Sequence, residues 1–150
     1  MAHPDISKTE AGEFVSCARQ ARGISWRELA DAIGRPPVWT VSALLGKHPV
    51  PAESAEIIVA KLGLGPEVSA ALQRQPYRTA DPALATDPTI YRFHEAIDVY
   101  GGALKELIHE EFGDGIMSAI NFNIEFAKEA DPNGDRVVVT FNGKFLPYQW

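Results

Sequence analysis

The sequence is short of the residues with which many small domains cross-link themselves. Only one of its 150 residues is a cysteine, Cys17, so an internal disulfide and a zinc site built from several cysteines are both excluded. This scarcity fits the reducing conditions of the cytoplasm. No hydrophobic run approaches the roughly 20 residues of a membrane-spanning helix. The first ten residues are polar and lack the basic and apolar regions of a signal peptide.

The motifs of several common enzyme classes are absent as well. The four histidines, His3, His48, His94 and His109, form no pair at the spacing of a metal-binding helix, so we predict no metal site. There is no Gly-x-Ser-x-Gly nucleophile elbow, and no glycine-rich phosphate loop follows a strand. The hydrophobic content of 45% is nevertheless enough to form a core without metals or disulfides.

Basic residues are also scarce in one half of the chain. Residues 1–74 carry eight Lys or Arg and eight Asp or Glu, whereas residues 75–150 carry six and twelve, so the second half holds the whole net charge of −6. Proteins that bind nucleic acids usually present a basic face, because contacts to phosphate supply most of their affinity. The charge distribution therefore argues against a nucleic acid as partner.

The first half of the sequence predicts a bundle of short helices. Apolar periodicity together with capping and proline signals predicts them at about 7–22, 25–34, 37–45, 52–62 and 66–74. The clearest start signal is the pair Ser25 and Glu28, which has the spacing of a capping box. Gly34 and Gly63 suit helix ends. Residues 76–88 contain three prolines and are predicted to form an extended linker between two domains, 1–75 and 89–150.

In the second half the pattern changes from helical to strand-like. Asp87 and Pro88 suit the start of a helix that Gly101 and Gly102 are expected to break, with a second helix at about 103–112. The alternation from Phe122 to Phe126 predicts a strand, and residues 136–141 predict another after a turn at 131–134. A further turn is expected at residues 142–143. The fold class is therefore α+β, with a helical bundle followed by a small α+β domain.

The helical half also resembles a DNA-binding domain of the repressor type. The predicted helices at 25–34 and 37–45 are joined by a short turn, as in a helix-turn-helix. However, the second of them contains no Arg, Lys, Asn or Gln, the side chains that most often contact base edges. A packing and assembly role is favoured, and a DNA-binding regulator stays as the alternative.

Three polar residues of the second half are candidates for chemistry. Arg92 and Glu95 stand three positions apart and so share a helix face. The ordinary interpretation is a surface ion pair, but aromatic neighbours such as Tyr91 suggest partial burial, which an arginine tolerates when it meets an anion. Ser118 follows Gly113-Asp114-Gly115, where a hydroxyl and backbone N–H groups come close together. A structural serine is the alternative there.

Two long segments around these residues resemble the cyanase family, also called cyanate hydratases or cyanate lyases. One runs from Ala85 to Phe93 and continues through Glu95 to Gly101, and the other spans Glu110–Phe122. The ending Asn142–Pro147 is similar to the last strand of that family. The helical half is similar as well, so the resemblance covers nearly the whole chain.

The resemblance implies a function and a site. It implies bicarbonate-dependent decomposition of cyanate to carbamate and carbon dioxide, with carbamate breaking down to ammonia. Arg92, Glu95 and Ser118 match the catalytic triplet of the family, and Ala119 matches a position whose backbone helps to hold the anion. His94 departs from the pattern, since tyrosine is expected there. The resemblance further implies a decamer of five dimers with sites between subunits, a C-terminal domain that dimerises, and no metal or organic cofactor.

Overall fold

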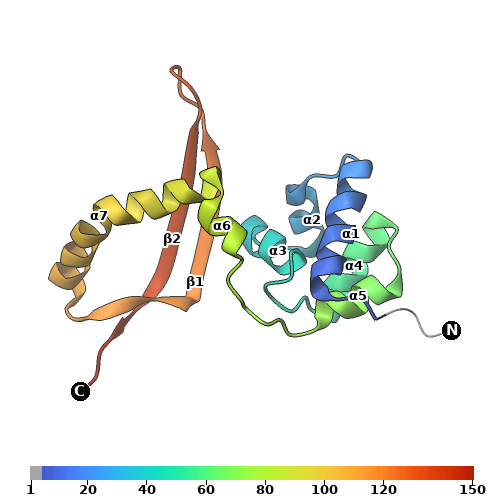
Figure 1. The fold of residues 1–150 in the computed structure, drawn as a ribbon, viewed down its shortest axis with the longest axis horizontal. Coiled ribbons are helices and arrows are strands. Elements are labelled where there is room, and N and C mark those ends of the chain that lie inside the picture. Colours follow the sequence, from blue (N-terminus) through green and yellow to red (C-terminus); the bar gives the residue numbers. More distant parts are fainter. Residues whose placement is uncertain (1–4) are drawn as a thin grey trace. The chain divides into compact units, whose positions relative to one another are not determined.

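The computed structural model describes residues 5–150 and has an α+β fold, which confirms the predicted class (Figure 1). Residues 1–4, and His3 with them, lie outside the described residues. The elements are α1 (Lys8–Ala21), α2 (Trp26–Ile33), α3 (Pro37–Leu44), α4 (Ala52–Leu62), α5 (Pro66–Gln73), α6 (Pro82–Thr86), α7 (Pro88–Phe112), β1 (Gly115–Glu129) and β2 (Arg136–Pro147).

The chain divides into two compact units, and the boundary between them passes through the β1–β2 hairpin. One unit contains the described residues up to Arg78 together with Ile124–Thr140, and the other contains Thr79–Asn123 together with Phe141–Trp150. The predicted domain limits, 1–75 and 89–150, stay a prediction. The expectation of an extended linker at 76–88 is wrong for its second half, where α6 forms because Asp81 accepts a hydrogen bond from the Ala83 N–H at 2.9 Å.

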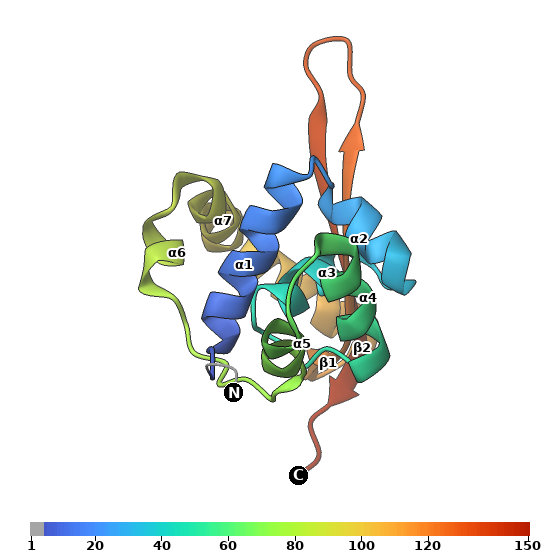
Figure 2. The same cartoon turned by 90° about the vertical axis from the view of Figure 1, so that its right-hand side faces the viewer.

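Helices α1 to α5 lie together in one bundle (Figure 2) and pack around one apolar core. All five helices contribute to its largest fully buried apolar side chains, which are Val15, Leu29, Leu44, Ile58, Leu62 and Leu72. Local signals determine where the helices begin and end. Ser25 and Glu28 form the predicted capping box, and Gly34 and Gly63 end α2 and α4 in the left-handed conformation. All five predicted helices are confirmed to within one residue at each end.

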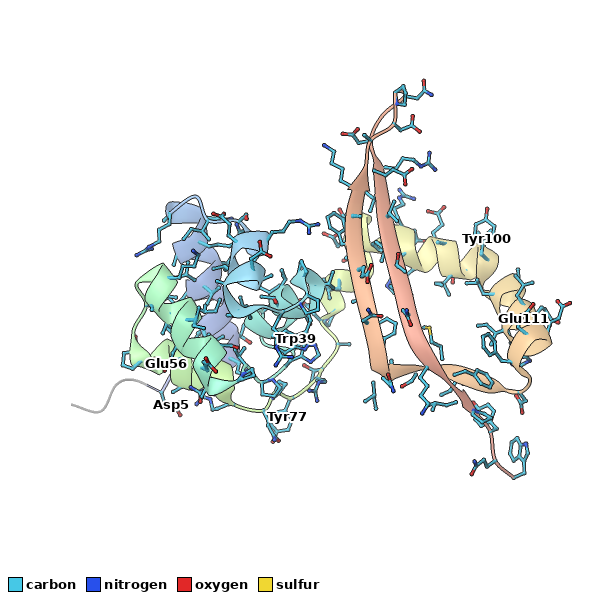
Figure 3. The ribbon with its side chains drawn as sticks, turned by 180° about the vertical axis from the view of Figure 1, so that it is seen from behind. Asp5, Trp39, Glu56, Tyr77, Tyr100 and Glu111 are labelled. Atoms are coloured by element: carbon cyan, nitrogen blue, oxygen red, sulfur yellow. The ribbon has the colours of Figure 1, made fainter. Side chains whose placement is uncertain are left out.

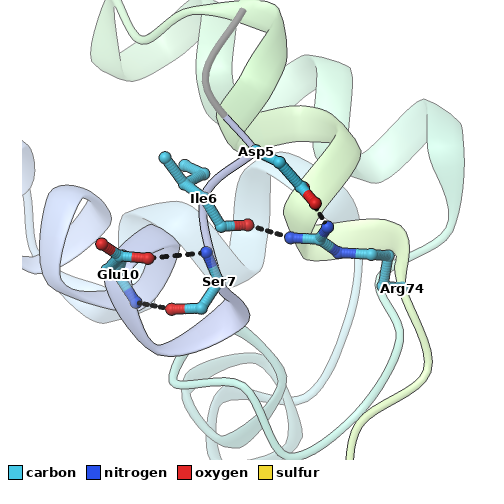
Figure 4. A network of polar contacts seen from close by, with 5 residues as sticks. All are labelled: Asp5, Ile6, Ser7, Glu10 and Arg74. Atoms are coloured by element: carbon cyan, nitrogen blue, oxygen red, sulfur yellow. Dashed lines mark hydrogen bonds and ion pairs between the residues drawn. The ribbon is translucent and has the colours of Figure 1, made fainter.

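The start of α1 is tied to the end of α5 by polar contacts (Figure 4). Arg74 donates hydrogen bonds to the carboxylate of Asp5 and to the carbonyl of Ile6. Ser7 caps α1 and exchanges hydrogen bonds with Glu10. Since these groups are exposed, each contact stabilises the fold only slightly, and together they close the bundle at this end.

A single long helix replaces the two helices expected between residues 88 and 112. The prediction that Gly101 and Gly102 break it is wrong, because α7 is helical through both. A glycine lowers helix stability by only about 1 kcal/mol and keeps its N–H donor, unlike proline. Figure 1 shows that α7 changes direction about midway along its length, so the glycine pair, which lies near the middle, fits a bend rather than an end. No helix between residues 5 and 150 has the length and apolar character to cross a membrane.

The hairpin is longer and more continuous than the sequence predicted. β1 begins at Gly115, well before the alternating segment at Phe122, and the predicted turn at Asp131–Gly134 is confirmed. The second predicted turn, at Asn142 and Gly143, is wrong, since β2 runs through both residues. Pairing with β1 overrides the local turn preference of this dipeptide, as tertiary context commonly does for strands.

Ile58 and Ile57 offer a matched test of the helical core. The Ile58 side chain is fully buried, whereas that of its neighbour Ile57 is 37% exposed. We expect Ile58→Ala to lower the free energy of unfolding by about 2–5 kcal/mol through the cavity that it leaves. Ile57→Ala should lower it by less than half as much. Urea unfolding followed by far-UV circular dichroism measures both, and equal losses would contradict this description of the core.

Candidate functional site

Arg92 and Glu95 lie near the beginning of α7, on one face of the helix. Asp87 holds the helix start by accepting hydrogen bonds from the N–H groups of Thr89 and Ile90, at 2.9 and 3.1 Å. One turn further, Arg92 Nη1 donates to Glu95 Oε2 at 2.6 Å, so the predicted pairing on one helix face is present. The side chains are 70% and 52% exposed. Within one chain, this is a solvent-exposed ion pair.

The expected burial of this pair by aromatic neighbours is wrong for the single chain. Tyr91, Phe93 and Tyr100 are themselves 47%, 42% and 64% exposed, and Figure 3 shows Tyr100 pointing outward from α7. An exposed ion pair contributes about 0–1 kcal/mol to stability. What the pair does offer is a positioned guanidinium, since only Nη1 is held by Glu95 and the remaining N–H donors of Arg92 are left for a ligand.

Ser118 lies on β1 and is buried, with 5% of its surface exposed. Its Oγ accepts hydrogen bonds from the N–H groups of Ile120 and Asn121, at 3.1 and 2.9 Å. In a regular strand, consecutive N–H groups point to opposite edges. Two consecutive N–H groups that meet one oxygen therefore mean that the strand bends, and Figure 1 shows a sharp turn of β1 near its beginning.

This geometry defines what the Ser118 hydroxyl can do. Its two acceptor positions are taken by the N–H groups of Ile120 and Asn121, so its remaining capacity is the O–H donor. A hydroxyl that accepts hydrogen bonds becomes a better donor, because the bonds polarise one another. Ser118 is thus arranged to donate a hydrogen bond rather than to attack as a nucleophile. The sequence did not reveal the two N–H donors, because they depend on the bend of the strand.

The structure brings together only part of the predicted site. Arg92 and Glu95 are joined, but no hydrogen bond or ion pair among residues 5–150 links either of them to Ser118. Ala119, next to Ser118, is exposed, and so is His94. The part of the chain described here contains no group of three or more His, Cys, Asp or Glu side chains that could hold a metal ion.

A groove of about 430 Å³ lies between α7 and the base of the hairpin. Its walls are mainly apolar and include Ile97, Leu104, Ile108, Met117 and Tyr148. None of the four predicted site residues lines it. An apolar groove suits the burial of an apolar surface rather than of a small anion, so we do not assign the polar site to it.

Comparison with known proteins connects this geometry to a family. Residues 9–76 match the family described as "Cyanate hydratase, N-terminal", and residues 82–150 match "Cyanate lyase C-terminal domain". A cyanate hydratase from Mycolicibacterium vanbaalenii is 60% identical over 97% of this chain and 95% of its own length. One from a Marinomonas species is 46% identical over 96% and 99%. The crystal structure of cyanase from T. urticae superposes with a TM-score of 0.82 at 37% identity, covering 92% of this chain and 96% of that chain.

Replacing Ser118 tests the two hydrogen bonds that bend β1. Ser118→Ala leaves the N–H groups of Ile120 and Asn121 without their acceptor, so we expect a loss of about 1–3 kcal/mol in the free energy of unfolding. Ser118→Thr keeps an oxygen at the same carbon and should lose less. Urea unfolding at matched protein concentration measures the difference. If Ser118→Ala is as stable as the wild-type protein, the Oγ does not hold the bend.

Proposed function

Because the chain belongs to the cyanate hydratase family, we propose that it decomposes cyanate with bicarbonate as co-substrate, at sites assembled where several copies of the chain meet. The chain is an enzyme of that family, and the alternative of a helix-turn-helix DNA-binding regulator is not favoured. The observation that carries the proposal is the Arg92–Glu95 pair, which presents a positioned guanidinium on a helix that buries none of its own residues.

The need for other copies follows from the distribution of apolar surface. The buried apolar residues among 5–150 all lie between Ala11 and Leu72, in the helical bundle. In residues 88–150, by contrast, large apolar side chains are exposed along α7, both strands and the tail: Tyr91, Phe93, Ile97, Val99, Tyr100, Leu104, Leu107, Phe112, Ile116, Met117, Ile120, Phe126, Val137, Phe141, Leu146, Tyr148 and Trp150. Surface of this kind marks an interface. A homo-oligomer, a decamer of five dimers as the family resemblance implies, would cover it.

Assembly would also supply the positive charge that binding two anions requires. Cyanate and bicarbonate are both anions, so bringing them together concentrates negative charge, in a half of the chain that already carries −6. One guanidinium that is already paired with the carboxylate of Glu95 offsets little of this charge. A site between subunits gathers more than one Arg92 and removes the anions from water, which strengthens each contact.

The proposed reaction begins with attack of a bicarbonate oxygen on the carbon of cyanate. The cyanate nitrogen takes up the bicarbonate proton and one proton from solvent, and the C–O bond to the former bicarbonate carbon breaks to release carbon dioxide. The product is carbamate, which takes up one further proton and splits into ammonia and a second carbon dioxide. In sum, cyanate, bicarbonate and two protons give ammonia and two molecules of carbon dioxide. The chemistry requires anion binding and proton transfer, and the proposal includes no metal or organic cofactor.

Each site residue has a role in this proposal. Arg92 binds the anions through the N–H donors that Glu95 leaves open. Ser118 donates its O–H to an oxygen or nitrogen of the substrate, as its two accepted hydrogen bonds favour. The backbone of Ala119, which is an exposed residue, supplies a further contact. Glu95 orients Arg92 and relays a proton. We place the protein in the cytoplasm, on the basis of its single cysteine, Cys17.

Bicarbonate dependence is the direct test of the proposed function. We expect ammonia release from cyanate in the presence of bicarbonate, and little or none after dissolved carbon dioxide and bicarbonate have been removed. The reason is that bicarbonate supplies the attacking oxygen. Ammonia is measured at several bicarbonate concentrations, alongside light scattering of the same sample to establish the oligomeric state. An equal rate without bicarbonate would refute the proposed reaction.

Arg92→Lys separates the shape of the cationic group from its charge. A lysine keeps the charge but presents a single point instead of a planar set of donors, so we expect kcat/KM for cyanate to fall at least tenfold. Arg136→Lys, an equally conservative change at the start of β2, is the matched control and should stay near the wild-type value. An Arg92→Lys variant as active as this control would show that the planar donor set is not required.

A further inference from the structure

Gly143 lies on β2, close to the backbone of Ser118 on β1. A Cβ atom placed on Gly143 would lie 2.5 Å from the carbonyl oxygen of Ser118 and 2.5 Å from Cγ of Met117. Non-bonded heavy atoms do not come so near to each other. The backbone of Gly143 does not adopt a positive φ, so its conformation is open to any residue. Glycine is therefore suited to this position because the backbone of Ser118 leaves no room for a side chain.

The two atoms that a Cβ at position 143 would clash with differ in how easily they can move. The Met117 side chain is flexible and can turn away. The carbonyl oxygen of Ser118, however, is part of the backbone and moves only if the peptide moves. The Ser118 side chain is in turn held by the N–H groups of Ile120 and Asn121. A side chain at position 143 would thus shift the whole bend that aims the Ser118 hydroxyl.

We propose that Gly143 is a positioning residue for the reaction, because the absence of its side chain determines where the Ser118 hydroxyl lies. The inference rests on the proposed function, in which that hydroxyl donates to the substrate. Displacements of about 1 Å at an active site reduce rates by roughly a hundredfold. Gly143 itself touches no substrate, so its effect passes through Ser118.

A double-mutant cycle on kcat/KM tests this path. The variants are Gly143→Ala, Ser118→Ala and the two combined, each assayed for bicarbonate-dependent ammonia release. We expect Gly143→Ala to lower kcat/KM by at least tenfold. In the Ser118→Ala background the same change should cost less than about threefold, because residues that act through one group are not additive. Losses that multiply in the double variant, or a Gly143→Ala variant of wild-type activity, would overturn the proposal.

Gly102→Ala is the matched control for the substitution itself. Gly102 lies in α7, where an added Cβ meets no atom within 4 Å. This variant should keep kcat/KM within about twofold of the wild-type value, because alanine is favoured over glycine in a helix. Far-UV circular dichroism and light scattering establish that every variant is folded and assembled as the wild-type protein is. If Gly102→Ala loses as much activity as Gly143→Ala, the effect is not specific to Ser118, and the proposal fails.

A second variant distinguishes the backbone contact from the side-chain contact. Met117→Ala combined with Gly143→Ala removes the clash with Met117 Cγ but leaves the clash with the Ser118 carbonyl. We expect this variant to assemble and to remain at least tenfold below Met117→Ala in kcat/KM. Recovery of activity would overturn the proposal, and so would failure of both Gly143→Ala variants to assemble, since Gly143 would then serve folding rather than one hydroxyl. A wild-type protein without bicarbonate-dependent activity would instead refute the proposed function.

Discussion

The uneven burial of apolar side chains is the constraint on which the rest of this structure depends. The helical bundle encloses its own core, with Leu29, Leu44 and Ile58 fully buried. In contrast, α7 has no buried residue although it is 25 residues long. Burial of apolar surface is the main favourable term in folding, and the second unit leaves much of its apolar surface exposed. The bundle therefore has a core of its own, whereas the unit that carries Arg92, Glu95 and Ser118 exposes most of its large apolar side chains.

The same constraint fits the separation of the candidate site residues within a single chain. Arg92 and Glu95 are exposed on α7, and Ser118 is buried in a bend of β1, with no hydrogen bond from one to the other. Groups that bind small anions work best when they are held rigidly and away from water. The rigid part is already present here, in the two N–H groups that hold Ser118. Exclusion of water is what further copies would add.

Much of the fold could be predicted from local sequence, and the family resemblance read from two segments is confirmed by the comparisons. Helix limits in the bundle follow from short-range signals such as Ser25 with Glu28 and Gly63, which act within one turn. The failures lie where a local signal is weak, as at Gly101, or where distant residues override it, as at Gly143. Gly101 does not end α7. Gly143 does not form a turn, because pairing with β1 keeps residues 142–143 extended.

The sequence by itself determined the helical bundle, the α+β class and the pairing of Arg92 with Glu95, since each depends on residues at most a few positions apart. Only the tertiary structure decided that this pair is exposed, that Ser118 is buried with its oxygen held by two backbone N–H groups, and that Gly143 leaves room for its carbonyl. Burial and close approach across a hairpin depend on residues far apart in the chain, which no local pattern specifies.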